Sequence, residues 1–158
     1  MPATGHILVV CTANICRSPM GAALLRHALA AEDGWLRSIP VVSAGVSARG
    51  GEPPTDHSVT SLKKVGLDIS GHVSRPLTQE LINGALVVIG MTDSHKAMVR
   101  LMADPEPKNL ILFREFVKEG DKEIADPYGC PLSVYEASRD EMVEALPSLV
   151  EFLKTLAK

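Results

Sequence analysis

Short apolar runs alternate with stretches of helical spacing along the chain, and this alternation restricts the possible folds more than any other feature. The runs are rich in Val and Ile, which is typical of strands buried on both faces of a parallel sheet. Four such strands are predicted, at Ile7–Val10, Ile39–Gly45, Ala85–Met91 and Leu110–Phe113. The alternation therefore predicts a single-domain α/β fold in which helices cover both faces of a four-stranded parallel sheet.

The helices are predicted between these strands and after the last one. Ser18 can cap the first helix, with Pro19 at its first position, where a missing amide hydrogen costs nothing. Pro147 falls inside the last helical pattern and should kink or split that helix. The other predicted helices are Asp56–Val65, Thr78–Ile82, a helix capped by Asp93 or Ser94 that ends near Met102, and a last helix from about Ser133.

Length and composition limit the class of protein. The 158 residues fit one domain, residues 1–158, and the net charge of −3 with both signs interspersed argues against a nucleic-acid partner. No apolar stretch reaches the roughly 18 residues of a membrane span, and no secretion signal is recognisable. Three cysteines do not suggest a disulfide framework. We therefore expect a cytoplasmic protein with no membrane partner. A monomer is expected as well, although no residue pattern specifies the oligomeric state.

The stretch "CTANICRSP", residues 11–19, follows the first predicted strand and leads into the first helix. Open parallel sheets bind ligands outside the carboxyl ends of their strands. Amides in such a loop have no intrahelical partner and the helix dipole adds positive charge, so the loop can hold an oxyanion. Cys11 would lie at its base as a nucleophile, and the planar fork of Arg17 suits two phosphate oxygens. The alternative is a buried cysteine beside an arginine that pairs with a carboxylate.

This nonapeptide resembles the signature Cys-x-Gly-Asn-x-Cys-Arg-Ser-Pro of the low-molecular-weight protein-tyrosine phosphatases. The resemblance covers nearly the whole chain, through "SAG" at 43–45, "GLDISGHVSR" at 66–75, "MTDSHK" at 91–96 and "DPYG" at 126–129. The last two look most like the bacterial members, which include protein-arginine phosphatases. Ala13 departs from the family glycine, and would cost on the order of 1 kcal/mol if the loop needs a positive φ there.

The resemblance implies three catalytic residues. Cys11 corresponds to the nucleophile that forms a cysteinyl-phosphate, and Arg17 to the residue that binds the phosphoryl oxygens in the transition state. Asp126 matches the general acid of the family's Asp-Pro motif, which protonates the leaving oxygen and then activates water. An aspartate before a proline also favours a turn, and both roles can coexist at this position.

Other residues that match the family pattern are expected to surround the loop and brace it. Ser18 corresponds to a hydroxyl that donates to the sulfur of the nucleophile. Asn14 corresponds to the asparagine that braces the loop, with Ser43 and His72 as its expected partners. Backbone amides complete the cradle, so the residues expected to line it are Thr12, Ala13, Asn14, Ile15, Cys16 and Ser18.

The remaining cysteines and histidines suggest few further functional roles. Cys16 is either a buried residue without a role or, by resemblance, the partner of a reversible disulfide with Cys11 after oxidation. Cys130 is interpreted as structural or surface-exposed. The histidines at 6, 27, 57 and 95 show no metal-ligand spacing, so neither a metal nor another cofactor is expected.

The identity of the substrate depends mainly on Ile15. Tyrosine phosphatases of the family resemble this chain in having an apolar residue there, whereas the arginine phosphatases usually carry threonine. Tyr128, close to the acid, is expected to form a wall against an aromatic ring. We therefore expect hydrolysis of phosphotyrosine in a protein substrate to give inorganic phosphate, with phosphoarginine as the alternative. An arsenate reductase would need two relay cysteines, and a non-catalytic phosphate-binding module would need neither Cys11 nor Asp126.

Overall fold

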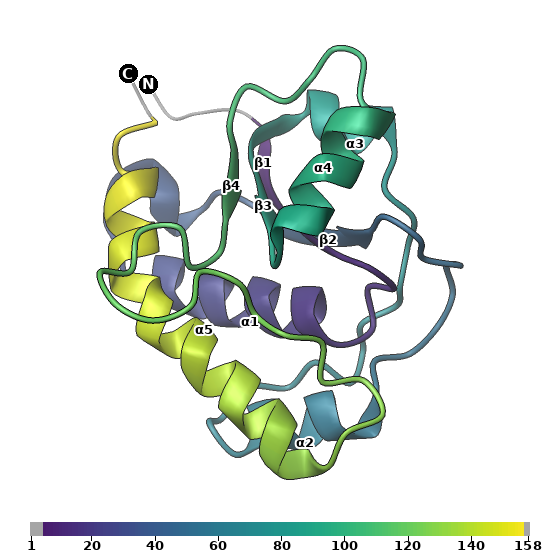
Figure 1. The fold of residues 1–158 in the computed structure, drawn as a ribbon. Helices are drawn as coiled ribbons and strands as arrows, with labels where there is room; N and C mark the ends of the chain where they lie inside the picture. The colour runs from purple at the N-terminus through teal and green to yellow at the C-terminus, as the bar shows by residue number, and fades with distance from the viewer. Residues whose placement is uncertain (1–4, 157–158) are drawn as a thin grey trace.

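The computed structural model describes residues 5–156 and contains one sheet of four strands (Figure 1). All three strand pairings are parallel. The strands lie in the order β2-β1-β3-β4 and are β1 (His6–Cys11), β2 (Val41–Gly45), β3 (Ala85–Gly90) and β4 (Leu110–Leu112). The predicted four-stranded parallel sheet is confirmed, and the strand that leads into the Cys11 loop is one of its two central strands.

Helices lie on both faces of this sheet, as predicted. They are α1 (Arg17–Ala30), the short 3-10 helix η1 (Gly34–Arg37), α2 (Asp56–Lys63), α3 (Gln79–Asn83), α4 (Asp93–Met102) and α5 (Leu132–Leu153). Ile7 and Val9 of β1 pack into a core with α1, α2 and α5. Leu8 and Val10 point to the other side, into a smaller core with α3 and α4 (Figure 1). Successive side chains of a strand alternate between faces, so β1 is apolar throughout.

The first helix begins earlier than predicted. α1 starts at Arg17 rather than Pro19, with Cys16 at its N-cap and no side-chain cap. The prediction that Ser18 caps this helix is therefore wrong. Its hydroxyl is already engaged with Cys11 and cannot serve the helix amides.

Two further helix predictions are wrong, one in the choice of N-cap and one in allowing the last helix to be split. Thr92, not Asp93 or Ser94, caps α4, because Thr92 is the residue with the extended backbone that an N-cap needs, at φ −139° and ψ 163°. The last helix, α5, runs unbroken through Pro147. Proline removes only one helical hydrogen bond, to the carbonyl of Val143, and the rest of the helix continues past it.

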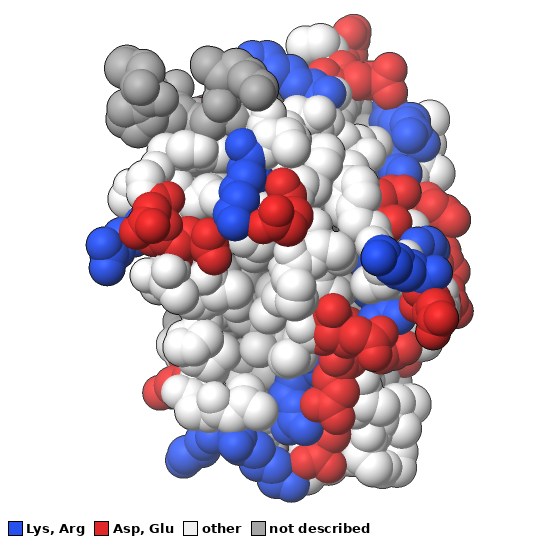
Figure 2. Space-filling model, turned by 90° about the vertical axis from the view of Figure 1, so that its left-hand side faces the viewer, with Lys and Arg blue, Asp and Glu red and all other residues white. Residues whose placement is uncertain are grey.

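The surface carries charges of both signs. Figure 2 shows one face, on which Lys and Arg are interspersed with Asp and Glu and separated by uncharged side chains. No continuous basic patch gathers there, in keeping with the interspersed charges of the sequence. Over residues 5–156, no helix combines the length and the apolar character that crossing a bilayer requires.

The ends of β1 and β2 hold the loop that follows Cys11. Cys11 is in register with Gly45, and the amide of Ser47 donates to the carbonyl of Thr12 across 2.9 Å. A Cβ at Gly45 would lie 2.5 Å from that same carbonyl oxygen, so only glycine allows this approach. Backbone contacts with the neighbouring strand thus fix the loop at the carboxyl edge of the sheet.

Candidate active site

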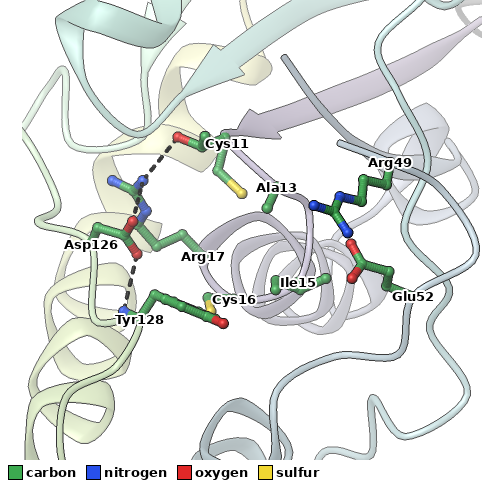
Figure 3. Close-up of a pocket in the computed structure, with 10 residues that line it drawn as sticks. Cys11, Ala13, Ile15, Cys16, Arg17, Arg49, Glu52, Asp126 and Tyr128 are labelled. Carbon is green, nitrogen blue, oxygen red and sulfur yellow. Dashed lines mark hydrogen bonds and ion pairs between the residues drawn. The ribbon is translucent and has the colours of Figure 1, made fainter. Parts of the chain in front are cut away.

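A cavity of about 400 Å³ opens at the carboxyl edge of the sheet, above the N-terminus of α1. The cavity brings together the three predicted catalytic residues, although Asp126 lies more than a hundred positions from Cys11 and Arg17 in the chain (Figure 3). Its lining consists of Cys11, Thr12, Ala13, Ile15, Cys16, Arg17, Arg49, Glu52, Asp126 and Tyr128. Asn14 and Ser18 are buried behind the loop rather than in the lining.

The sulfur of Cys11 accepts hydrogen bonds from the residue that follows Arg17. The amide of Ser18 donates to Sγ across 3.4 Å, and the Ser18 hydroxyl lies 2.9 Å from Sγ. Asn14 Nδ2 donates to that hydroxyl oxygen across 2.7 Å, which leaves the Ser18 proton free to reach the sulfur. Two donors at the N-terminus of a 14-residue helix therefore stabilise negative charge on Cys11.

Asn14 is fully buried and braces the loop from behind. Its Nδ2 also donates to the Ser43 hydroxyl across 3.0 Å, and its Oδ1 accepts the amide of Arg75 across 3.0 Å. His72 Nε2 donates to the Asn14 carbonyl across 2.8 Å, while burial lowers the pKa of His72 and so keeps its ring neutral. Ser43 and His72 thus contact Asn14 as the resemblance implied.

The positive φ expected in this loop belongs to Asn14 and not to Ala13. Asn14 has φ +61°, and it is the only residue other than glycine with a positive φ between residues 5 and 156. Asparagine tolerates this left-handed conformation better than most residues. Ala13 lies outside that region, so its Cβ carries no backbone strain of the expected kind.

Arg17 is buried at 4% exposure, with its guanidinium facing the cavity. Its Nη1 donates to the carbonyl of Ile124 across 2.9 Å, and its Nη2 donates weakly to the Thr12 hydroxyl across 3.5 Å. Nη2 also lies 3.7 Å from Asp126 Oδ2, an oxygen on a side chain that is 53% exposed. This long contact with a solvated carboxylate does not engage the fork fully, so Arg17 can still receive an anion.

Asp126 lies at the mouth of the cavity in a tight turn. Its Oδ1 accepts the amide of Tyr128 across 3.1 Å, while the carboxyl group faces Arg17 (Figure 3). Asp126 thus forms the turn that an aspartate before a proline favours, and it still lines the cavity. Tyr128 is 64% exposed, so its ring is available to contact a substrate that enters the cavity.

Cys16 lies inside the loop and is buried. Its Sγ is 3.4 Å from the Tyr135 hydroxyl and 3.5 Å from the Thr55 hydroxyl. Burial raises the pKa of the Cys16 thiol, so that it stays protonated at neutral pH. Cys11 and Cys16 are both reduced, and Cys130 lies outside the cavity lining. Over residues 5–156, no group of three or more side chains has a metal-binding arrangement.

Sequence reasoning missed two charged residues on the opposite side of the mouth. Arg49 and Glu52 come from the loop after β2, and Figure 3 shows them facing each other beyond Ala13. A signal was available, because this loop follows a strand of the same parallel sheet and must begin at the same edge. The irregular "RGGEPP" sequence gave no reason to choose these two side chains.

The fold and this cavity together are those of a protein phosphatase. The chain matches the family described as low molecular weight phosphotyrosine protein phosphatase over residues 6–158, and it belongs to that family.

Both kinds of phosphatase occur among its relatives. It is 41% identical to a protein-arginine-phosphatase of Geobacillus stearothermophilus over 95% of this chain and 97% of the relative. It is 35% identical to the low molecular weight protein-tyrosine-phosphatase Etp of Escherichia coli K12, over 77% and 76%. Among solved structures, a YwlE mutant from Bacillus subtilis superimposes with a TM-score of 0.85 at 33% identity, covering 96% of this chain and 99% of that one.

Proposed function

We propose that this phosphatase hydrolyses phosphotyrosine in proteins through a cysteinyl-phosphate intermediate. In the first step, the Cys11 sulfur attacks phosphorus, the bond to the tyrosine oxygen breaks, and Asp126 gives its proton to that oxygen. In the second step, Asp126 takes a proton from water, the water oxygen attacks phosphorus, and the sulfur leaves as thiolate. Inorganic phosphate is the product, and no cofactor takes part.

The hydrogen bonds around the loop support these roles. Arg17 and the loop amides would hold the three non-bridging oxygens, whose charge is spread in the transition state. The Ser18 hydroxyl would donate to the sulfur as it leaves in the second step, and Asn14 keeps that hydroxyl oriented. The contacts among Asn14, Ser18 and Cys11 that these roles use are already formed without substrate.

The observation that carries the choice of substrate is the apolar Ile15 in the lining of the cavity, together with the exposed ring of Tyr128. An isoleucine side chain packs well against a flat aromatic ring, but it offers no hydrogen bond to a guanidinium. Phosphoarginine remains the second candidate because arginine phosphatases are among the similar relatives, and because Glu52 and Asp126 offer carboxylates at the mouth.

A pair of matched peptides tests the choice of substrate. Phosphotyrosine and phosphoarginine peptides of otherwise identical sequence would be hydrolysed by the wild type, by Ile15→Thr and by the control Ile15→Val. We expect the wild type and Ile15→Val to prefer phosphotyrosine, and Ile15→Thr to shift toward phosphoarginine. A wild type with the higher kcat/KM on phosphoarginine would overturn the phosphotyrosine proposal in favour of the second candidate.

We also propose that the enzyme is a cytoplasmic monomer that oxidation inactivates reversibly. Peroxide would convert the Cys11 thiolate to a sulfenic acid and be reduced to water. The Cys16 sulfur would then attack the Cys11 sulfur and release a second water as the disulfide forms. Because both sulfurs belong to one short loop, the disulfide would protect Cys11 from further oxidation.

A further inference from the structure

His95 is a buried histidine beside the cavity that the proposed mechanism does not use. It is the third residue of α4 and is 4% exposed. Its Nδ1 lies 3.2 Å from the amide nitrogen of Thr92, and a backbone amide can only donate. Nδ1 is therefore the unprotonated nitrogen, and a neutral ring carries its single proton on Nε2.

That proton is directed at Thr12, a residue 83 positions away. His95 Nε2 donates to Thr12 Oγ1 across 3.0 Å, and Arg17 Nη2 donates to the same oxygen across 3.5 Å. A hydroxyl oxygen has two lone pairs, and these two donors occupy both of them. The Thr12 proton must therefore point away from His95 and Arg17.

The free direction is toward the cavity. Thr12 is an exposed residue and lines that cavity beside Cys11 and Arg17. Within residues 5–156, the Thr12 hydroxyl donates to no protein acceptor. Its proton is thus available at the place where the phosphoryl oxygens would lie.

We propose that the Thr12 hydroxyl donates a hydrogen bond to a phosphoryl oxygen of the substrate, and that His95 is the positioning residue that turns this proton toward the cavity. The inference deepens the proposed function and rests on it. With the other ring tautomer, Thr12 would donate to His95 and present a lone pair to the phosphate, which would repel the anion. The amide of Thr92 prevents that arrangement by occupying Nδ1.

The surroundings of His95 keep this donor in one state. Burial, together with the nearby guanidinium of Arg17, lowers the pKa of His95 to about 4, although the charge of Asp126 acts in the opposite direction. The ring is then neutral at neutral pH. His95 consequently acts as a fixed donor and takes no part in proton transfer.

The test measures the binding of inorganic phosphate as a competitive inhibitor, together with kcat/KM on an aryl phosphate. Thr12→Val keeps the shape of the side chain but has no proton to donate, and we expect both quantities to worsen on the order of tenfold. Thr12→Ser, which keeps the hydroxyl, should recover most of that loss. His95→Phe keeps a buried ring without a donor and should weaken phosphate binding to a similar extent. His95→Gln, which can still donate, should lose less.

The double variant Thr12→Val with His95→Phe separates positioning from a structural role. If His95 acts through Thr12, its replacement will weaken phosphate binding little further once the hydroxyl is gone. An equal loss in both backgrounds would overturn the role of His95. A Thr12→Val enzyme that binds phosphate like the wild type would overturn the role of Thr12. A wild type that hydrolyses no phosphate ester would instead contradict the proposed function itself.

Discussion

Asn14 donates from Nδ2 to the Ser18 hydroxyl across 2.7 Å, and this bond decides which way the Ser18 proton points. The amide of Asn14 is itself oriented, because its Oδ1 accepts the backbone amide of Arg75. A chain of donors therefore runs from the backbone to the Cys11 sulfur. The direction of each bond is fixed by the one before it, so the loop is preorganised to receive an anion.

Removing the Asn14 side chain should damage both stability and activity. Asn14→Ala loses three hydrogen bonds, two of them buried, and leaves an alanine at φ +61°, so we expect a loss of about 3 kcal/mol in the free energy of unfolding. Urea denaturation would measure this loss, and kcat/KM should fall at least tenfold. Asn14→Gly loses the same hydrogen bonds but has no Cβ to strain the backbone. It should therefore be about 1 kcal/mol more stable than Asn14→Ala.

Asn83→Ala is the matched control for this experiment, because Asn83 is exposed at the end of α3 and its side chain accepts a hydrogen bond from the neighbouring Gln79. We expect it to change stability by less than about 0.5 kcal/mol. An Asn14→Ala enzyme with wild-type activity would show that the bracing is irrelevant to the reaction.

Replacing Ser18 with alanine should slow the second chemical step. The departing Cys11 thiolate would lose a donor at 2.9 Å, so we expect kcat to fall roughly ten- to hundredfold. Because breakdown of the cysteinyl-phosphate then limits turnover, rapid mixing should reveal a burst of phenol before the steady state. Ser148→Ala in α5, where the hydroxyl bonds only to the Ala145 carbonyl, provides the control. A lower kcat without any burst would place the defect in the first step instead.

Removing the charge of Asp126 should lower kcat/KM by an amount that depends on the leaving group of the substrate. Asp126→Asn cannot protonate the departing oxygen, so we expect a loss of about a thousandfold in kcat/KM on an alkyl phosphate with a poor leaving group. An activated aryl phosphate, which leaves without help, should lose only about tenfold. Asp140→Asn, at an exposed position beside Arg139, is the matched control. Equal losses on both substrates would exclude Asp126 as the acid.

The sequence was sufficient for the sheet and for the residues of the loop, because both depend on local patterns. Runs of Val and Ile predict buried strands, and Cys11 and Arg17 are predicted by their spacing between a strand and a helix. Ser43 and His72 were found only by resemblance to a family, since they contact Asn14 from distant segments. No local rule relates positions so far apart.

The features that were missed depend on the tertiary structure. Thr92, Asp93 and Ser94 are all good N-cap residues, and only the backbone conformation selects Thr92. Arg49 reaches the cavity through the path of an irregular loop. The bond from His95 to Thr12 joins the first turn of α4 to the loop after β1, and it becomes visible only when β1 and β3 are paired.

Oxidation should be reversible only while Cys16 is present. After brief exposure to peroxide, we expect a thiol reductant to restore activity to the wild type, and intact mass to show the loss of two hydrogens as the disulfide forms. Cys16→Ser should instead gain two or three oxygens at Cys11, as a sulfinic or sulfonic acid, and stay inactive after reduction. Cys130→Ser is the control, because Cys130 lies outside the cavity lining. Full recovery of the Cys16→Ser enzyme would exclude the protective disulfide.

The free energy of unfolding should fall in acid because His95 is buried as a neutral ring. Its pKa is about 4 in the folded chain against 6.5 in the unfolded chain, so the unfolded state binds more protons between these values. The contribution of His95 to the free energy of unfolding is thus complete above pH 6.5. It is lost as the pH falls toward 4, and the loss amounts to up to about 3 kcal/mol. Arg17 and Asp126 are the charged groups that influence it.

Urea denaturation between pH 7 and pH 4.5 would measure this effect by comparing the wild type with His95→Gln. His72, whose pKa burial also lowers, contributes in the same direction to both proteins and cancels in the comparison. The same substitution at His27, exposed on α1, removes a histidine without touching the cavity and serves as the control. We expect the stability of His95→Gln to decline less steeply in acid than that of the wild type. Parallel curves for the two proteins would mean that His95 binds a proton as readily in the folded chain as in the unfolded one, and would contradict its assignment as a fixed neutral donor.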